Sequence, residues 1–231
     1  MPEPYSDEFE IPVLAAGESP LHGYRGAVAE ESALVVPAGL TIAISREAGA
    51  RGATIAKRAG EKLGWDVYSQ DMLEYGANNG SLRQEVLDGL TPAAADWVNE
   101  RLQTLMEQQS LSQHPNILEM ARLILALGAH GNVILLGRGA GFILPTRSTL
   151  HVRMIAPIAD RIAYMTQSLR LTEEEAADQV RKRDHRRTDF LATHFHRKPN
   201  DVHLYDVILN TIARGTPGFS GDGPGVSTQI G

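Results

Sequence analysis

Hydrophobic and polar positions along the chain follow two alternating patterns. Short runs of apolar and β-branched residues predict buried strands, whereas apolar residues that recur every three or four positions predict helices. By this criterion five strands are expected, at residues Leu40–Ser45, Trp65–Tyr68, Asn132–Leu136, Leu150–Ile155 and Asp206–Leu209.

Helical spacing and helix-start signals occupy most of the intervals between these strands. Thr91-Pro92 combines a capping residue with proline at the first helical position, and Thr172 forms a capping box with Glu175. The interval between Tyr68 and Thr91 is expected to be a loop. Helices are expected over Ala53–Leu63, from Pro92 past Leu105, over Pro115–His130, from Pro157 to about Leu169, and from Thr172 into a basic stretch.

Strands joined by helical crossovers predict an α/β fold with a five-stranded parallel sheet flanked by helices on both faces. Ligands of such sheets bind at the carboxyl ends of the strands. Gly49 and Gly52 follow the first expected strand, and Gly137-Arg138-Gly139 follows the third. We therefore expect two turns suited to anion binding at the same edge of the sheet.

The two ends of the chain differ in composition from the part between them. Residues 1–38 hold seven acidic residues and one basic residue, so they account for the whole net charge of −6. Residues 214–231 are rich in glycine, proline, serine and threonine. We expect an N-terminal extension over 1–38, one domain over 39–213 and a flexible tail over 214–231.

Composition also excludes several classes of protein. The chain has no cysteine, which excludes disulfides and thiolate metal sites and fits a reducing compartment. No apolar run is long enough to span a membrane, and the N-terminus lacks the basic-then-apolar pattern of a signal peptide. We expect a cytoplasmic protein that does not bind membranes.

The glycine loop, Ser45–Thr54, has the layout of a phosphate-binding loop: a strand, a turn of small residues and a helix. In the form G-x-x-x-x-G-K-[ST], Ala53 occupies the lysine position and Glu47 that of the first glycine. The alternative is an ordinary turn that needs glycine. As a phosphate loop, it would offer backbone amides, the Thr54 hydroxyl for Mg²⁺, and replacement positive charge from nearby basic residues, namely Arg46, Arg51 and Lys57.

Two further elements carry positive charge. Arg138 lies between two glycines just after an apolar strand, where it could grip an anion through two hydrogen bonds or merely pair with a carboxylate. The basic segment, Arg181–Lys198, holds seven basic and two acidic residues. It is interpreted as a lid over transferring phosphates, with a solvated helix face and a nucleic-acid patch as alternatives. His185, His194 and His196 form only a weak zinc pattern.

Four segments together resemble the cytidylate kinase-like branch of the P-loop nucleoside monophosphate kinases. They are TIAISREAGARGATIAKRAGEKLG, WDVYSQDML, NVILLGRGAGFIL, and the stretch from LHVRMIAP through RKRDHRRTDF to LYDVILN. The resemblance spans about residues 40–211. It implies a P-loop kinase fold with a helical lid at about 181–198, ATP and Mg²⁺ as cofactors, and phosphoryl transfer to CMP, dCMP or a related acceptor.

Residue roles are implied by the same resemblance. Binding of the ATP phosphates is assigned to Arg46, Gly49, Ala50, Arg51, Gly52, Ala53 and Thr54, with Thr54 also on the metal. Binding of the acceptor is assigned to Ser69, Asp71, Arg138 and Asp184. Catalysis is assigned to Arg51 and the lid arginines Arg183, Arg186 and Arg187.

The missing lysine leaves a second hypothesis open, a catalytically weak nucleotide-binding regulatory module with a degenerate phosphate loop. The expected partners under both hypotheses are small-molecule nucleotides, and a homo-oligomer is possible. A nucleic-acid partner is the least favoured of these, because the basic segment accompanies an anion loop on a parallel sheet.

Overall fold

The computed structural model describes residues 36–212. The expected extension over 1–38 lies outside this range except for its last three residues, and so does the whole expected tail over 214–231. Both remain predictions.

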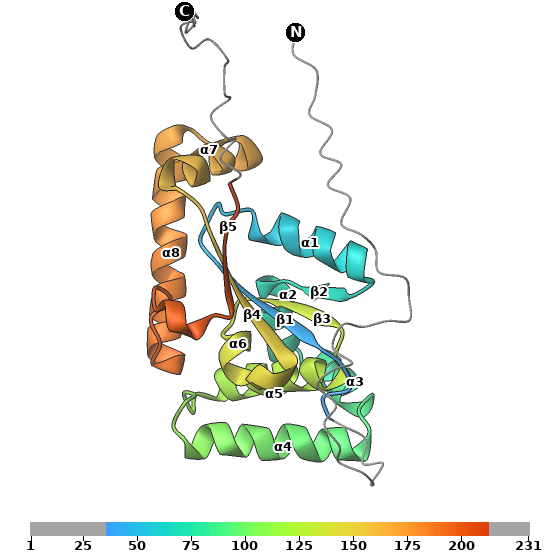
Figure 1. The fold of residues 1–231 in the computed structure, drawn as a ribbon. Helices are drawn as coiled ribbons and strands as arrows, with labels where there is room; N and C mark the ends of the chain where they lie inside the picture. Colours follow the sequence, from blue (N-terminus) through green and yellow to red (C-terminus); the bar gives the residue numbers. More distant parts are fainter. Residues whose placement is uncertain (1–35, 213–231) are drawn as a thin grey trace, which may run out of the picture. The chain divides into compact units, whose positions relative to one another are not determined.

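A five-stranded parallel sheet forms the centre of the domain, in the strand order β2-β3-β1-β4-β5 (Figure 1). This confirms the predicted fold class and each of the five strands. No strand boundary differs from the expected one by more than one residue. The strands are β1 (Thr41–Arg46), β2 (Asp66–Tyr68), β3 (Val133–Leu136), β4 (Thr149–Ile155) and β5 (Val207–Asn210).

The strand register brings the two predicted turns together. Ile44 of β1 lies opposite Leu136 of β3, and the Gly137 amide donates to the Ile44 carbonyl at 2.9 Å. On its other side, Ile44 lies opposite Val152 of β4. The carboxyl ends of these three strands are therefore level, and the segments that leave them enter the same space.

The five helices predicted from sequence are present as α1, α4, α5, α7 and α8. The capping box of Thr172 and Glu175 is present and begins the longest helix. The helices are α1 (Gly52–Leu63), α2 (Gln70–Asn78), α3 (Gly80–Asp88), α4 (Pro92–Glu107), α5 (Pro115–His130), α6 (Ala140–Ile143), α7 (Ile158–Leu169) and α8 (Glu173–Phe195), with 3₁₀ turns η2 (Thr146–Ser148) and η3 (Val202–Leu204).

The prediction of a loop between Tyr68 and Thr91 was wrong, because this interval forms α2 and α3. Ser69 caps α2 by accepting from the Met72 amide, and Asn79 caps α3 by accepting from the Leu82 amide. Helix α3 has no buried residue, so it lacks the apolar stripe on which a periodicity argument depends. The two caps are the local signals that could have indicated these helices.

The two faces of the sheet are covered by different helices (Figure 1). Ala56 of α1 packs with Ile44 and Ile134 on one face. Ala43 and Leu135, whose side chains alternate with these, belong to the larger core on the opposite face. That core is built mainly by α5, which contacts α2, α4 and α6.

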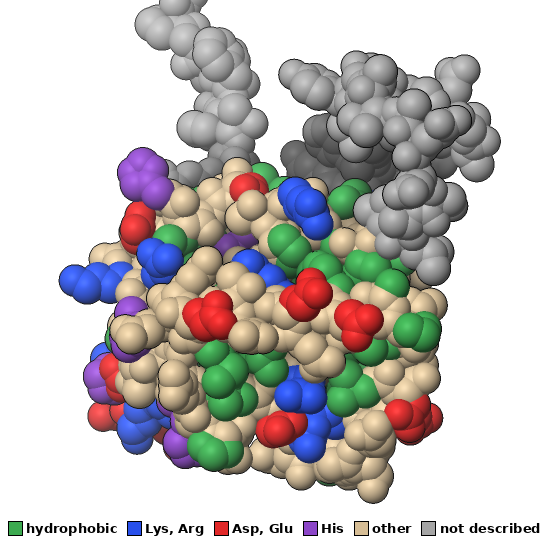
Figure 2. All heavy atoms as spheres, turned by 90° about the horizontal axis from the view of Figure 1, so that it is seen from below, with side chains coloured by type: hydrophobic (Ala, Val, Ile, Leu, Met, Phe, Trp, Pro, Cys, Tyr) green, Lys and Arg blue, Asp and Glu red, His purple; other side chains and the backbone are tan. Residues whose placement is uncertain are grey.

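Helices α7 and α8 pack against each other beside the carboxyl edge of the sheet (Figure 1). Near its start α8 shares a small apolar cluster with Met165 of α7, and near its end Leu191 and Phe195 are buried in the main core. The basic segment thus comprises the second half of α8 and the residues after it. Within residues 36–212, none of the helices is long and apolar enough to cross a membrane. Figure 2 shows one face, on which charged side chains alternate with small apolar patches.

Candidate active site

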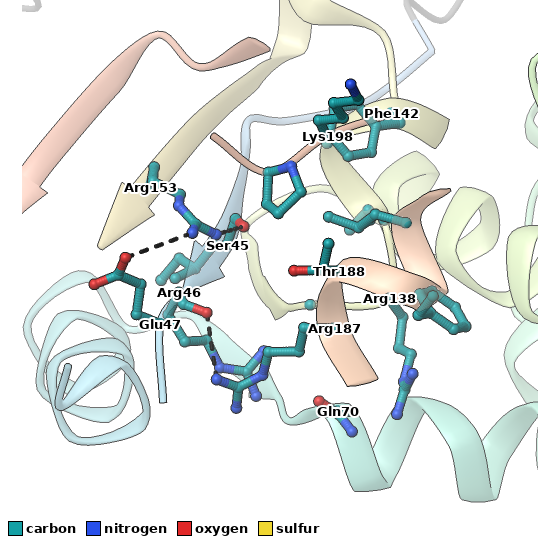
Figure 3. A pocket seen from close by; sticks show the side chains of 18 of the residues that line it. Ser45, Arg46, Glu47, Gln70, Arg138, Phe142, Arg153, Arg187, Thr188 and Lys198 are labelled. Carbon is teal, nitrogen blue, oxygen red and sulfur yellow. Dashed lines mark hydrogen bonds and ion pairs between the residues drawn. The ribbon is translucent and has the colours of Figure 1, made fainter. Parts of the chain in front are cut away.

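A cavity of about 490 Å³ lies at the carboxyl ends of β1, β3 and β4, beneath α8 (Figure 3). We call it the main cavity. Four arginines line it, and three of them form a cluster from separate elements: Arg46 ends β1, Arg138 follows β3, and Arg187 comes from α8. The remaining polar lining includes Ser45, Glu47, Gln70, Arg153, Asp184, Thr188 and Lys198.

Arg46 lies between the two predicted turns. Its aliphatic stem runs beside Gly52, and a Cβ on Gly137 would lie 2.5 Å from its Nη1 atom. Gly137 also has φ +80°, a conformation that favours glycine. Burial, followed by the charge of Arg138, lowers the pKa of Arg46 to about 10, while Asp71 acts in the opposite direction.

Arg138 occupies a turn in which three successive residues have positive φ, 80°, 54° and 72° for Gly137, Arg138 and Gly139. A non-glycine residue in this region costs roughly 1–2 kcal/mol. The guanidinium forms an ion pair with Glu74 of α2 and lies over the ring of Phe190 at 4.5 Å. Burial lowers the pKa of Arg138 to about 10; Asp71 raises it and Arg187 lowers it.

Arg187 completes the cluster from α8. Its Nη1 donates to the main-chain carbonyl of Arg46 at 3.3 Å and lies 3.8 Å from Asp184 (Figure 3). Burial, then the charge of Arg46, lowers the pKa of Arg187 to about 10. The three guanidinium groups stay protonated at neutral pH and repel one another in a desolvated space. A bound anion would relieve that repulsion, which makes this cluster a candidate anion site.

The other end of the main cavity is less polar. Phe142 and Leu191 line it together with His151, which meets Phe142 edge-on at a ring-centroid distance of 5.1 Å. Burial lowers the pKa of His151 to about 4, despite the opposing charge of Asp206, so its imidazole is neutral at pH 7. A ligand with a phosphate at one end and a flat ring at the other matches this division.

The glycine loop is placed differently from the arginine cluster. Residues 48–54 all lie in the described range, yet none of them lines the main cavity. Ala50 and Gly52 are buried, whereas Arg51 is exposed and its guanidinium lies over the Tyr164 ring at 5.2 Å. The first turn of α1 contains no acidic residue, so its amides keep their attraction for an anion.

The metal role assigned to Thr54 stays a prediction. The Thr54 hydroxyl is exposed and lies 3.4 Å from the Tyr164 hydroxyl. Among the residues that the structure describes, no group of three or more His, Cys, Asp or Glu side chains could hold a metal ion. A Mg²⁺ ion that is bound together with substrate phosphates usually needs only one or two protein carboxylates, so this finding does not test the role assigned to Thr54.

Among the residues assigned to the acceptor and the lid, Arg138, Asp184 and Arg187 line the main cavity and the others do not. The Ser69 hydroxyl caps α2, and the negative charge of Asp71 raises the pKa of Arg46 and of Arg138. Arg183 does not line the main cavity, although its charge lowers the pKa of Arg187. Arg186 is exposed. Asp184 lines the cavity, but the Ala48 amide donates to it at 2.7 Å and Arg161 binds it at 2.5 Å.

Several residues of the site were missed from sequence. Arg153 donates to the Ser45 hydroxyl at 2.9 Å and lies 4.0 Å from Glu47. An arginine inside the apolar strand β4 was a usable signal, because a charge there must face a cavity or a partner. Glu74 and Arg161 lie on helices with many polar positions and gave no comparable signal.

Comparison with solved structures supports the fold. An uncharacterized protein from Eubacterium ventriosum is 19% identical with a TM-score of 0.50, and the match covers 74% of this chain and 87% of that one. A shikimate kinase from Bacteroides thetaiotaomicron is 13% identical (TM-score 0.39; 74% and 86% covered). The protein TT1252 from Thermus thermophilus is 18% identical (TM-score 0.40; 74% and 88% covered). At this identity the first match supports a shared fold alone.

Sequence comparison assigns the family. No curated protein matches the chain. The model of the cytidylate kinase-like family matches residues 41–213, which is well over half of the chain and includes every strand and helix of the domain. The chain therefore belongs to the cytidylate kinase-like family, and its general activity is of the nucleotide kinase type.

Proposed function

We propose that this protein transfers the γ-phosphoryl group of ATP to a nucleoside monophosphate, with CMP and dCMP as the first acceptors to test. The observation that carries the proposal is the convergence of Arg46, Arg138 and Arg187 in one cavity at the carboxyl edge of the sheet. The family assignment supports a kinase, and the cluster supports an acceptor that carries a phosphate.

The arginines supply what phosphoryl transfer needs most from a protein. The reaction involves little covalent chemistry for the enzyme, because positioning and charge neutralisation account for most of the catalysis. Arg138 would hold the acceptor phosphate from the side of α2. Arg187 and Arg46 would neutralise charge on the transferring group, a role that can be worth roughly 10³–10⁵ in rate for a well-placed arginine.

The apolar end of the main cavity would take the acceptor's base. Phe142 offers an aromatic ring there, and neutral His151 adds no charge against a neutral base. ATP would place its phosphates at the N-terminus of α1, beside Arg51 and Thr54. Mg²⁺ would arrive with the nucleotide. Such an enzyme would act on nucleotides of the cytoplasm.

The alternative, a nucleotide-binding regulatory module, is favoured by one specific observation. The glycine loop has alanine at the lysine position, and its Ala48 amide already donates to Asp184. One amide that a phosphate loop would offer to ATP is therefore in use. This arrangement would weaken ATP binding and slow its chemistry.

A single panel distinguishes the two functions. The protein is incubated with ATP, Mg²⁺ and, in turn, CMP, dCMP, UMP, AMP or GMP, and ADP release is followed while calorimetry measures binding. Turnover with one acceptor well above the ATP-only rate supports the kinase. Binding of ATP or a monophosphate without turnover supports the module. The absence of both binding and turnover would contradict each.

A further inference from the structure

Three backbone polar groups at the start of the glycine loop are bound by side chains of α7 and α8. Arg187 donates to the Arg46 carbonyl at 3.3 Å. The Ala48 amide donates to Asp184 Oδ1 at 2.7 Å, and Arg161 Nη1 donates to the Ala48 carbonyl at 3.3 Å. Asp184 Oδ2 and Arg161 Nη1 are themselves 2.5 Å apart. One ion pair thus binds both polar groups of Ala48.

The same part of the loop is held by packing. The Ala48 side chain is 2% exposed and lies in the apolar cluster with Met165 and Val180. A Cβ on Gly49, which has φ +81°, would lie 2.5 Å from the Arg161 carbonyl oxygen. At this position glycine is therefore required by the approach of α7, and no approach of a ligand is needed to explain it.

Glu47 extends this network to the neighbouring strand. Its Oε2 atom lies 3.5 Å from Arg161 Nε and accepts from the Ala156 amide at 3.2 Å. Loop, strand end and both helices are thereby joined by charged side chains that are mostly shielded: Arg161 is 11% exposed and Asp184 30% exposed. Losing one member of such a pair leaves its partner's charge without compensation.

Both carboxylate oxygens of Asp184 are engaged within the chain. Each of its two oxygens already accepts a hydrogen bond, from Ala48 on one side and Arg161 on the other. Arg187 lies one helical turn further along α8 and points into the main cavity. Asp184 therefore lies between the loop and the arginine that would meet the substrate.

We propose that Asp184 and Arg161 are positioning residues, which join residues Arg46–Gly49 to α7 and α8 as one unit so that Arg46 and Arg187 face the same anion. The substrate consequence rests on the proposed function. The joining itself does not, because it concerns only contacts within the chain.

Hydrogen exchange tests the joining without any need for activity. Exchange of the amides in residues 46–54 is measured for the full-length wild type and for Asp184→Ala, Asp184→Asn, Arg161→Ala and Arg161→Lys. Each alanine variant is expected to exchange the Ala48 amide at least about tenfold faster. Asp184→Asn and Arg161→Lys, which keep an acceptor and a charge respectively, are expected to recover part of the protection.

The control is Arg83→Ala. This variant removes a different, partly buried ion pair, in which Arg83 Nε of α3 lies 2.9 Å from Glu119 Oε2 of α5. It is expected to lower the melting temperature without changing exchange in residues 46–54. The double variant Asp184→Ala/Arg161→Ala is expected to be no worse than the worse single variant, because both act through the same contact. If the Ala48 amide exchanges at the wild-type rate in both Asp184→Ala and Arg161→Ala, the proposal is overturned.

Kinetics with ATP and the best acceptor add a second readout. Positioning predicts that Asp184→Ala and Arg161→Ala lower kcat and raise the KM for ATP alike, although Arg161 does not line the main cavity. A direct ligand predicts instead that Asp184→Ala raises only the acceptor KM while Arg161→Ala matches wild type, and that result would also overturn the proposal. If the wild type has no turnover, the proposed function fails while the exchange experiment still decides the joining.

Discussion

The turn after β3 and the loop after β1 look alike in sequence and behave differently in the structure. Both follow an apolar strand, and both combine glycine with arginine. In the Gly137–Gly139 turn, all three residues line the main cavity and Arg138 points at it. In the glycine loop, Gly49 packs against Arg161 and the exposed Arg51 lies over Tyr164.

The difference shows that a glycine after a strand can make room either for a side chain or for the backbone of another element. Gly137 makes room for a charged side chain that serves a ligand site, whereas Gly49 makes room for the backbone of a neighbouring helix. The positive charge of the site also comes from different places than a phosphate loop would suggest. Arg46 supplies it from the strand end and Arg187 from α8, and neither lies at the lysine position.

Removing the charge of the β3 turn should have the largest effect on function. Arg138→Ala is expected to lower kcat/KM by roughly 10²-fold or more, because a buried charge-assisted contact with the transferring or accepting phosphate is lost. The measurement is steady-state ADP release at saturating ATP. Arg181→Ala, an exposed change on α8 (69% exposed), is the matched control and should keep wild-type turnover. Equal turnover of Arg138→Ala and wild type would remove Arg138 from the site.

The glycine loop should respond mainly in stability. Gly49→Ala places a Cβ against the Arg161 backbone at a positive φ, so we expect a loss of roughly 2–3 kcal/mol in the free energy of unfolding. Chemical denaturation measures this loss. An unchanged midpoint would show that α7 can move away from the loop, contrary to the proposed joining of the loop to α7 and α8.

The free energy of unfolding should depend on pH through His151, which packs against the helix that follows the β3 turn. The His151 ring lies against Gly141 of α6, the helix that comes after the turn, and burial lowers its pKa from 6.5 to about 4. The unfolded chain therefore binds this proton as the pH falls below about 6.5, while the folded protein does not. Stability is complete above pH 6.5 and should fall by on the order of 1–2 kcal/mol between pH 6.5 and 5.

His151→Phe is the variant that tests this pH dependence, because it keeps an aromatic ring beside Phe142 and cannot be protonated. Its unfolding free energy should fall less steeply over the same pH interval. Parallel pH profiles for the variant and the wild type would assign the acid sensitivity to other groups.

Gly137→Ala should have the smallest effect on stability and thereby sharpen the contrast with Gly49. The added Cβ would meet the far end of the flexible Arg46 side chain instead of a backbone, so the main cost is the positive φ, about 1 kcal/mol. Displacing Arg46 should weaken phosphate binding several-fold, as measured by calorimetry with the best monophosphate. A stability loss larger than that of Gly49→Ala would reverse the comparison.

Much of the fold could be predicted from local patterns. Alternating strands and helices were sufficient for the parallel sheet, and Thr172 with Glu175 marked the start of α8, because a cap and an apolar stripe are properties of neighbouring residues. Helices α2 and α3 escaped notice because α3 buries no side chain and so leaves no periodic trace. Glycines on both sides of Arg138 were enough to single that residue out.

The sequence by itself determined the order of the elements, the sheet and the presence of an arginine between two glycines at a strand end. Only the tertiary structure decided which charges meet: that Arg46 and Arg187 join Arg138, and that Asp184, at the wall of the main cavity, is bound by the Ala48 amide and Arg161. The reason is range. Periodicity and capping act over a few residues, whereas Asp184 and Ala48 are brought together by the packing of α8 against the carboxyl edge of the sheet, and no short-range pattern specifies that distance.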